Sequence, residues 1–256
     1  MKRALALVAA LALFALVPST PVSADAPRSL GDALVRVAHF SPDTAGVDVW
    51  VDGKRVLQNV GYDTVSDYVT LPAGNHQFAL RPFGASSTSK PVLSANAALA
   101  ANIAYTIAGV GLNRDLHGQI FQDNLGAPPA GSAKVRVIDA AVGAAPVSVV
   151  LAGGATFGAV GFATASTYKA VAPNTYGVRI AGVGKSILNV PSVVVAAGII
   201  YSFAVIGGAG KPLQLVPVVD ARGPAVEPVG PAGTGGGGTA RIRVHRIHVG
   251  NRSSRA

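Results

Sequence analysis

The chain of 256 residues has no cysteine, a single Met, a single Trp and a single glutamate. Without cysteine it can form neither a disulfide nor a thiolate metal site, and it cannot carry a lipid on a cysteine thiol. The one glutamate, Glu227, lies in a stretch rich in Gly and Pro, which excludes a glutamate general acid from the sequence before that stretch. We therefore expect a protein whose stability comes from packing alone.

Motifs for catalysis are also lacking. The sequence contains no His-Glu-x-x-His pair, which would hold zinc, and no Gly-x-Ser-x-Gly nucleophile elbow. We expect that the protein is not an enzyme. A hydrolase that assembles Ser and His from different loops remains an open alternative, although no nucleophile and base pair can be recognised.

Charged residues are few, at 13% of the chain, and positive charge exceeds negative charge by 9. Most of this excess lies near the two ends, because residues 25–222 hold 14 Lys and Arg against 11 Asp. The body is thus close to neutral, and we expect no nucleic-acid partner. In the basic tail, Arg241, Arg243 and Arg246 can contact a polyanion by salt-sensitive attraction, and cell-wall or surface polymers are the expected candidates.

The first residues have the three regions of a secretory signal. Met1, Lys2 and Arg3 are followed by an apolar run of 14 residues and then by small residues up to Ala24. That run is short for a bilayer span, which needs about 20 residues, so an uncleaved anchor is the lesser alternative. We predict a signal peptide over residues 1–24, a secreted or extracellular protein that can associate with the cell wall, and no transmembrane segment in the mature chain.

The composition favours strands. Apolar residues are 50% of the chain, and 31 Gly and 17 Pro favour short strands with many turns over long helices. Alternating apolar positions in residues 47–51, followed by Asp52-Gly53, predict a hairpin over residues 46–58. Residues 71–74 predict a second turn, and the apolar run of residues 103–110 predicts a central strand.

A comparison of the chain with itself reveals a repeat at an offset of 100 residues, which falls to 96 further along. Val35-Arg36-Val37 recurs as Val135-Arg136-Val137, and Ile103-Ala104-Tyr105 as Ile199-Ile200-Tyr201. Each copy has the pattern of about seven short strands, which predicts an all-β protein of two tandem immunoglobulin-like β-sandwich modules. We place the modules at residues 33–126 and 132–222, a Pro-rich hinge at 127–131, and a disordered Gly/Pro-rich linker and basic tail at 223–256.

The first copy carries linked motifs. They are Val35-Arg36-Val37-Ala38-His39-Phe40-Ser41-Pro42-Asp43, Val47-Asp48-Val49-Trp50-Val51-Asp52-Gly53, Ser66-Asp67-Tyr68 and Leu71-Pro72-Ala73-Gly74. In this wording the chain resembles the bacterial secreted module known as domain of unknown function 4397. The resemblance implies an exported β-sandwich module, often in tandem, in cell-envelope or secreted proteins, with no established catalytic activity.

Aspartates of the first copy form the only acidic cluster of the chain, and calcium prefers several carboxylate and carbonyl oxygens. The candidate ligands are Asp43, Asp48, Asp52 and Asp67. Alternatively, Asp48 and Asp52 are turn residues or the solvated face of a strand. The second copy has other residues at all four positions, so any such site belongs to the first copy.

Two further residues are candidates for a surface contact with a protein or a glycan: His39, and Trp50, which alternation places on the face of Asp48. We expect no cofactor other than calcium. The leading hypothesis is therefore a non-catalytic secreted or cell-envelope protein that acts as a scaffold, a spacer or a binding surface, with envelope proteins or surface polymers as partners. A calcium- or carbohydrate-binding module centred on the first repeat is the alternative.

Overall fold

The computed structural model describes residues 31–144, 146–182 and 185–223. These residues form strands, turns and one short 3₁₀ helix, and they belong to one compact unit. The predicted signal peptide of residues 1–24 and the predicted tail from residue 224, with Arg241, Arg243 and Arg246, lie outside the described residues. No helix of the described part is long and apolar enough to cross a membrane.

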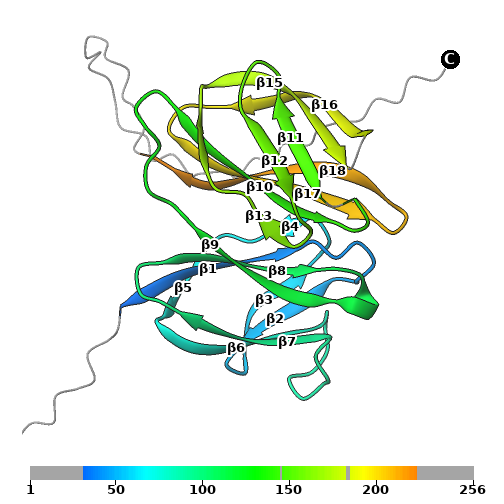
Figure 1. The fold of residues 1–256 in the computed structure, drawn as a ribbon. Coiled ribbons are helices and arrows are strands. Elements are labelled where there is room, and N and C mark those ends of the chain that lie inside the picture. Colours follow the sequence, from blue (N-terminus) through cyan, green and yellow to red (C-terminus); the bar gives the residue numbers. More distant parts are fainter. Residues whose placement is uncertain (1–30, 145, 183–184, 224–256) are drawn as a thin grey trace, which may run out of the picture. The chain divides into compact units, whose positions relative to one another are not determined.

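The first module contains nine strands (Figure 1). They are β1 Asp32–His39, β2 Val47–Val51, β3 Lys54–Val60, β4 Thr64–Val65, β5 Val69–Pro72, β6 Gly74–Pro82, β7 Leu93–Leu99, β8 Ala104–Val110 and β9 His117–Asp123, with the 3₁₀ helix η1 Asn113–Asp115 before β9. The second module repeats the same order. Its strands are β10 Ala133–Ala141, β11 Val147–Leu151, β12 Thr156–Val160, β13 Thr164–Ala165, β14 Lys169–Val171, β15 Asn174–Gly182, β16 Lys185–Val195, β17 Ile199–Gly208 and β18 Lys211–Arg222.

Each module is a sandwich of two sheets. The five-stranded sheet of the first module has the order β4-β1-β8-β9 with β5 also on β1, and that of the second has β13-β10-β17-β18 with β14 on β10. The four-stranded sheets have the orders β3-β2-β6-β7 and β12-β11-β15-β16. In both modules the central pair, β1 with β8 or β10 with β17, is parallel. The predicted all-β fold with two tandem sandwich modules is confirmed.

Local predictions can now be compared with the strands. The hairpin is confirmed as β2 and β3, and its turn residues Asp52 and Gly53 have φ of 49° and 77°, which the type I′ turn requires. Residues 104–110 form the predicted central strand, between β1 and β9. The expected number of seven strands was too low, because β4 has only two residues and carries no periodic signal.

The predicted turn at residues 71–74 is the place where the chain changes sheets. Before it, β5 pairs with β1 in the five-stranded sheet, and after it β6 pairs with β2 in the four-stranded sheet. The bend therefore closes one edge of the sandwich instead of joining two neighbouring strands of one sheet. The same change occurs between β14 and β15 in the second module.

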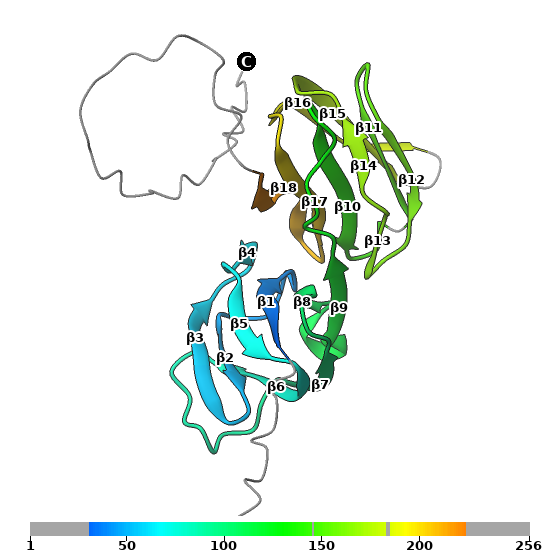
Figure 2. The ribbon, with the colours of Figure 1, turned by 90° about the vertical axis from the view of Figure 1, so that its left-hand side faces the viewer.

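The two five-stranded sheets lie between the four-stranded sheets, as Figures 1 and 2 show. One face of each packs on its own module: Val35 and Val37 of β1 belong to the core of the first module. The opposite faces meet in a separate apolar cluster to which both modules contribute, including Phe40 and Phe121 from the first and Ile138 and Ile206 from the second. Strands β1 and β10 are therefore buried on both faces.

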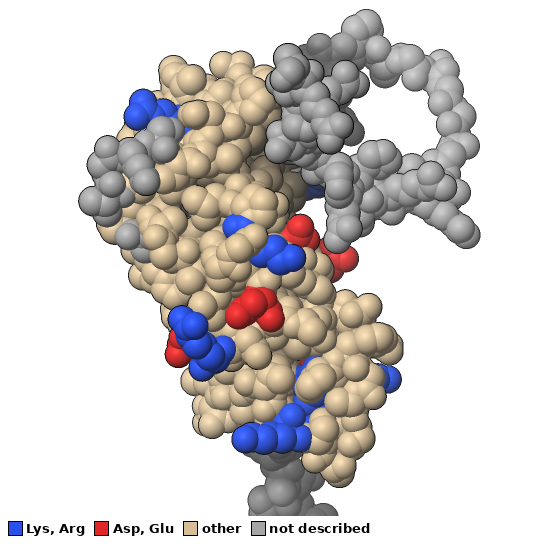
Figure 3. Space-filling view, turned by 90° about the vertical axis from the view of Figure 1, so that its right-hand side faces the viewer, with Lys and Arg blue, Asp and Glu red and all other residues tan. Residues whose placement is uncertain are grey.

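The surface is mainly uncharged. On the face drawn in Figure 3, Lys, Arg, Asp and Glu occur in small groups separated by wide uncharged areas. This agrees with the low charged fraction of the sequence. A charged group that is buried in such a protein needs partners, since the transfer of a charge out of water costs free energy that the partners must offset.

Candidate functional site

The junction between the two modules contains a buried ionic network. Arg36 of β1 is 2% exposed and donates from Nη2 to Asp220 Oδ1 of β18, at 2.6 Å. Its Nε donates to the Thr106 hydroxyl at 2.8 Å, and its Nη1 lies 3.5 Å from the carbonyl oxygen of Val219. An arginine of the first module is thus held by a carboxylate and a carbonyl of the second.

The second module makes the equivalent contacts to the first. Arg136 of β10 donates from Nη2 to Asp123 Oδ1 of β9, from Nε to the Ser202 hydroxyl at 2.7 Å and from Nη1 to the Gln122 carbonyl at 3.0 Å. The interface is therefore reciprocal: each module supplies one arginine and one aspartate, and each arginine crosses to the other module's aspartate. This is the self-complementary arrangement of a two-fold dimer, here within one chain.

Two tyrosines and two hydroxyls complete the network. Tyr68 and Thr106 both donate to Asp123 Oδ2, each at 2.6 Å, while Tyr168 and Ser202 both donate to Asp220 Oδ2, each at 2.7 Å. The guanidinium groups lie over the rings of the tyrosines of their own modules, at 4.7 and 4.8 Å from the centroids. Every side-chain nitrogen and oxygen of the network has a partner, which is the condition under which buried ion pairs are tolerated.

The electrostatics of the network follow from burial and pairing. Burial raises the pKa of Tyr68 and of Tyr168, and the neighbouring aspartates raise both further, so the phenols stay protonated and donate. Burial by itself lowers the pKa of Arg36, but Asp220, Tyr68 and Asp123 outweigh it and raise that pKa. The network joins the two modules, and each of its acidic and basic groups has a partner within it.

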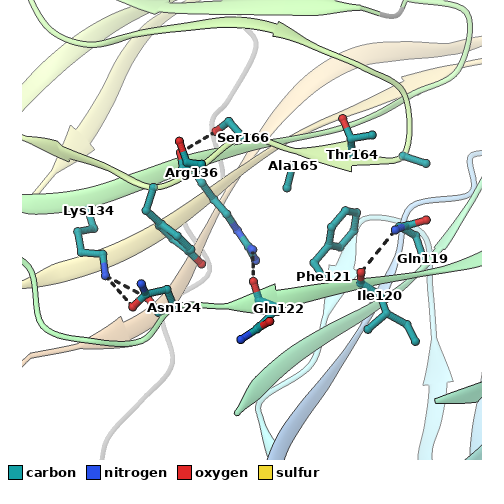
Figure 4. Close-up of a pocket in the computed structure, with 13 residues that line it drawn as sticks. Gln119, Ile120, Phe121, Gln122, Asn124, Lys134, Arg136, Thr164, Ala165 and Ser166 are labelled. Atoms are coloured by element: carbon teal, nitrogen blue, oxygen red, sulfur yellow. Dashed lines mark hydrogen bonds between the residues drawn. The ribbon is translucent and has the colours of Figure 1, made fainter. Parts of the chain in front are cut away.

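A groove of about 620 Å³ opens beside this network (Figure 4). It runs between residues 119–124 of the first module and residues 163–168 of the second. Lys134 closes one end, where its Nζ donates to the Gly126 carbonyl at 2.8 Å and to both oxygens of Asn124. The lining residues include neither a histidine nor a carboxylate, and Lys134 and Tyr168, which do line the groove, are hydrogen-bonded to Gly126 and Asp220.

The aspartates predicted as calcium ligands lie on different elements with separate partners. Asp43 Oδ1 accepts from the Asn113 amide at 2.7 Å, and Asp52 accepts from the Gln77 amide at 2.9 Å. Asp67 is exposed. Among the described residues no group of three or more His, Cys, Asp or Glu could hold a metal ion. Calcium binding stays a prediction, and the described residues offer no cluster of ligands that supports it.

Asp48 differs from the other three because its side chain is fully buried. It accepts from the amides of Asn59 at 2.9 Å and Gly84 at 3.3 Å, and from Arg55 at 3.3 Å. Burial raises its pKa, but these donors outweigh burial and lower it. The alternative that Asp48 is part of a solvated strand face was wrong, because the alternation of the strand does not reveal the amides of Asn59 on β3 and of Gly84 that bind its carboxylate.

His39 and the residue that matches it in the second module, Asp139, are both buried. His39 is 2% exposed, so it does not lie on the surface as expected, and burial lowers its pKa although Nε2 contacts the Ala45 carbonyl at 3.2 Å. Burial raises the pKa of Asp139 to about 6, and only the Ala141 amide offsets this. One module thus buries a base where the other buries an acid.

Trp50 is partly exposed on the outer face of the four-stranded sheet, as alternation predicted. The guanidinium carbons of Arg55 and Arg81 lie 5.8 and 5.9 Å from its ring centroid. The sequence interpretation identified Trp50 but missed both arginines, because Arg81 comes from β6 and reaches Trp50 only through the pairing of β2 with β6.

Sequence reasoning also missed the junction, although the repeat contained a signal. Arg36 and Tyr68 recur at the offset of 100 as Arg136 and Tyr168, whereas the aspartates of the predicted calcium set do not recur; Asp220, the counterpart of Asp123 in the structure, is one residue beyond the offset of 96. A charged residue retained in both copies, between apolar neighbours of a strand, indicates a shared structural role for which a single copy gives no evidence.

Comparisons with known proteins agree with the repeat. The model of the family described as "Domain of unknown function (DUF4397)" matches residues 33–150 and again residues 133–228. A search of curated proteins found no match. The two matches cover most of the chain and follow the two sandwich modules, so the chain belongs to the DUF4397 family and contains two tandem copies of its domain.

Proposed function

We propose that this protein is a non-catalytic secreted or cell-envelope protein in which two β-sandwich modules act as one rigid scaffold or spacer and present a binding surface. The observation that carries the proposal is the reciprocal burial of Arg36 with Asp220 and of Arg136 with Asp123. Two desolvated ion pairs between the modules add little net stability. Their contribution is mainly to a defined geometry, which a flexible tandem would not require.

Several features support a spacer over an enzyme. The junction is closed by apolar packing as well as by charge, and the groove beside it is lined by neither a histidine nor a carboxylate. The four-stranded sheets lie farthest from the junction and are free to carry contacts. The signal-like residues 1–24 and the envelope setting that the family resemblance implies support export.

Rigidity can be tested by distance measurements, since the absence of cysteine allows spin labels to be placed at will. Gln58 of β3 and Asn189 of β16 are both exposed, one on each module. With Gln58→Cys and Asn189→Cys labelled, pulsed electron resonance is expected to give one narrow distance distribution. The same pair in a chain with Asp123→Ala and Asp220→Ala should give a broad one. A broad distribution in the otherwise unchanged chain would refute the rigid scaffold.

Export is tested separately in the source cells. The mature protein is expected in the medium or the envelope fraction, with Asp25 as its first residue by mass spectrometry. Retention of residues 1–24 on cytosolic protein would contradict this part of the proposal.

The calcium alternative is tested by melting the mature protein with and without millimolar calcium. A rise of several degrees that Asp43→Ala with Asp48→Ala abolishes would favour it, since a ligand that binds only the folded state raises the melting temperature. An esterase and glycosidase screen tests the remaining hydrolase alternative.

A further inference from the structure

The outer sheet of the first module holds a tryptophan between two arginines. Trp50 lies on β2, Arg55 on the neighbouring strand β3 and Arg81 on the other neighbour, β6. Both guanidinium groups lie within 6 Å of the ring centroid, a distance at which the ring attracts a cation. Strand pairing on both sides of β2 therefore builds this cluster, which we call the Trp50 cluster.

Three donors of the Trp50 cluster have no acceptor in the part of the chain that the structure describes. Trp50 Nε1 and Arg81 Nε and Nη1 are buried atoms with no hydrogen-bond partner among the described residues. The carboxylate nearest in register to Arg81 is Asp48, which is already occupied by two backbone amides and Arg55. A buried donor without an acceptor is costly, so an acceptor from outside the chain would be bound with a gain.

The second module shows that the fold does not need this cluster. At the offset of 100 residues, Val150, Ala155 and Ala181 stand where the first module has Trp50, Arg55 and Arg81. The strands β11, β12 and β15 nevertheless pair as β2, β3 and β6 do. The three side chains are therefore additions to a sheet that forms without them.

Arg55 lies near the same ring as Arg81 and is the more exposed of the two arginines. Trp50 and Arg81 are each partly exposed, whereas the Arg55 side chain is 43% exposed and held by one ion pair of 3.3 Å. Asp48 of this pair is buried, but it keeps the Asn59 and Gly84 amides as donors when the exposed Arg55 guanidinium turns away. A ligand can then reach Arg81 while it packs against the indole ring.

We propose that the Trp50 cluster binds the carboxylates of an acidic polysaccharide. Arg81 and the indole N–H supply donors to an oxyanion, and the indole face supplies the flat apolar surface on which a sugar ring packs. Several charges on one polymer chain add attraction that a single small anion lacks. The inference rests on the proposed role as a binding surface, but it does not depend on the rigid pairing of the modules.

The test uses the fluorescence of Trp50, the only tryptophan of the chain. Full-length mature protein is titrated with hexameric oligogalacturonate, with a neutral glucose hexamer and with sodium sulfate. We expect a saturable change with the acidic hexamer only. The variant Arg81→Ala, which has the residue found at position 181, should weaken binding about tenfold or more, since a charge-assisted hydrogen bond is lost.

The matched control is Arg179→Ala, at an exposed arginine on β15 of the second module. It should leave binding unchanged within about twofold, a span of less than 0.5 kcal/mol. Because Arg81→Ala can act through misfolding, its melting temperature is compared with that of the parent chain, and Trp50→Val is titrated by calorimetry. Equal binding of the neutral hexamer, equal binding of sulfate, or equal losses for Arg81→Ala and Arg179→Ala would each overturn the inference. Those results would leave the spin-label distances, and hence the scaffold, unaffected.

Discussion

The two modules share their strand order and the ionic groups of the sheets that face each other, and they differ on their outer sheets and at buried positions such as His39 and Asp139. The arginine, aspartate and tyrosine of the junction occur in both. Trp50, Arg81 and Asp48 occur only in the first module, and the second has Val150, Ala181 and Ser148 at the matching positions. The ionic groups that recur in both copies therefore serve the junction, and the groups that occur in one copy are open to a separate role.

The largest effect is expected at the shared positions. Asp220→Ala leaves Arg36 buried without its carboxylate and should lower the free energy of unfolding by about 3–5 kcal/mol. Asp123→Ala should cost a similar amount, because the junction is reciprocal. Urea unfolding measures both. The double variant Arg36→Met with Asp220→Leu should recover most of the loss, and a double variant as unstable as Asp220→Ala would show that the charges themselves are needed.

At the matched buried pair, His39 and Asp139, the modules should respond to pH in opposite directions. The pKa of Asp139 is raised to about 6 by burial, so its contribution is fully present below an unfolded pKa near 3.8 and is lost as pH rises through about 6. At pH 8, Asp139→Asn should raise the free energy of unfolding by roughly 2 kcal/mol, and it should do little at pH 4. Thermal melts at both pH values decide this, and a gain at pH 4 would argue against it.

His39 affects the acid side of the dependence of stability on pH, opposite to the side that Asp139 affects. Burial lowers its pKa, so the folded state resists protonation and stability falls as pH drops below the unfolded value near 6.5. His39→Gln should therefore flatten the acid side of the stability profile, while Asp139→Asn flattens the alkaline side. Melting temperatures measured from pH 4 to pH 8 separate the two. Loss of both limbs in one single variant would mean that the residues do not act independently.

Asp48 sharpens the contrast between the outer sheets. Asp48→Ala leaves the amides of Asn59 and Gly84 without an acceptor and should cost about 1–2 kcal/mol. Ser148→Ala, at the matching position of the second module, should cost less than about 0.5 kcal/mol. Chemical denaturation compares the two variants directly. Equal losses would mean that Asp48 supports its loop no more than Ser148 does.

The smallest effect is expected at the contact of His76 with Asp52, which is 2.6 Å long and reaches the surface. Burial would lower the pKa of His76, but Asp52 and the Pro72 carbonyl raise it, so the stability from this pair is present below pH 6.5 and lost above the raised value. His76→Gln should cost below about 0.5 kcal/mol at pH 5 and nothing measurable at pH 8. Melts of the variant and the parent chain at both values measure the difference.

Much of the fold could be predicted from the sequence because its signals are local. The Asp52-Gly53 turn, the alternation of residues 47–51 and the apolar run before Val110 each determine one element, and the repeat doubles them. The two-residue strands β4 and β13 could not be predicted, since their pairing depends on the bend around them. The sequence also did not predict that the outer faces of the two five-stranded sheets are buried against each other, because Arg36 and Arg136 have the sequence pattern of solvent-facing residues.

The candidate sites were less accessible to prediction for a related reason. Trp50 stands out in the sequence by its rarity, but Arg81 is 31 residues away and becomes its neighbour only when β6 pairs with β2. The aspartates lie close in sequence, yet they lie on different elements and have separate partners. Closeness along the chain therefore wrongly predicted a calcium cluster, and distance along the chain concealed the contact of Trp50 with Arg81.

The reciprocal junction makes the chain a covalent pseudo-dimer, and this has a consequence for how its copies can change. In a dimer of identical subunits every substitution appears twice, so an outer face cannot acquire a ligand group on one side alone. Fusion removes that restriction, because each copy need keep only its own Arg and Asp for the partnership to hold. Two fused copies that preserve their inner sheets can then diverge on their outer sheets, so that one copy supports the structure and the other changes for recognition.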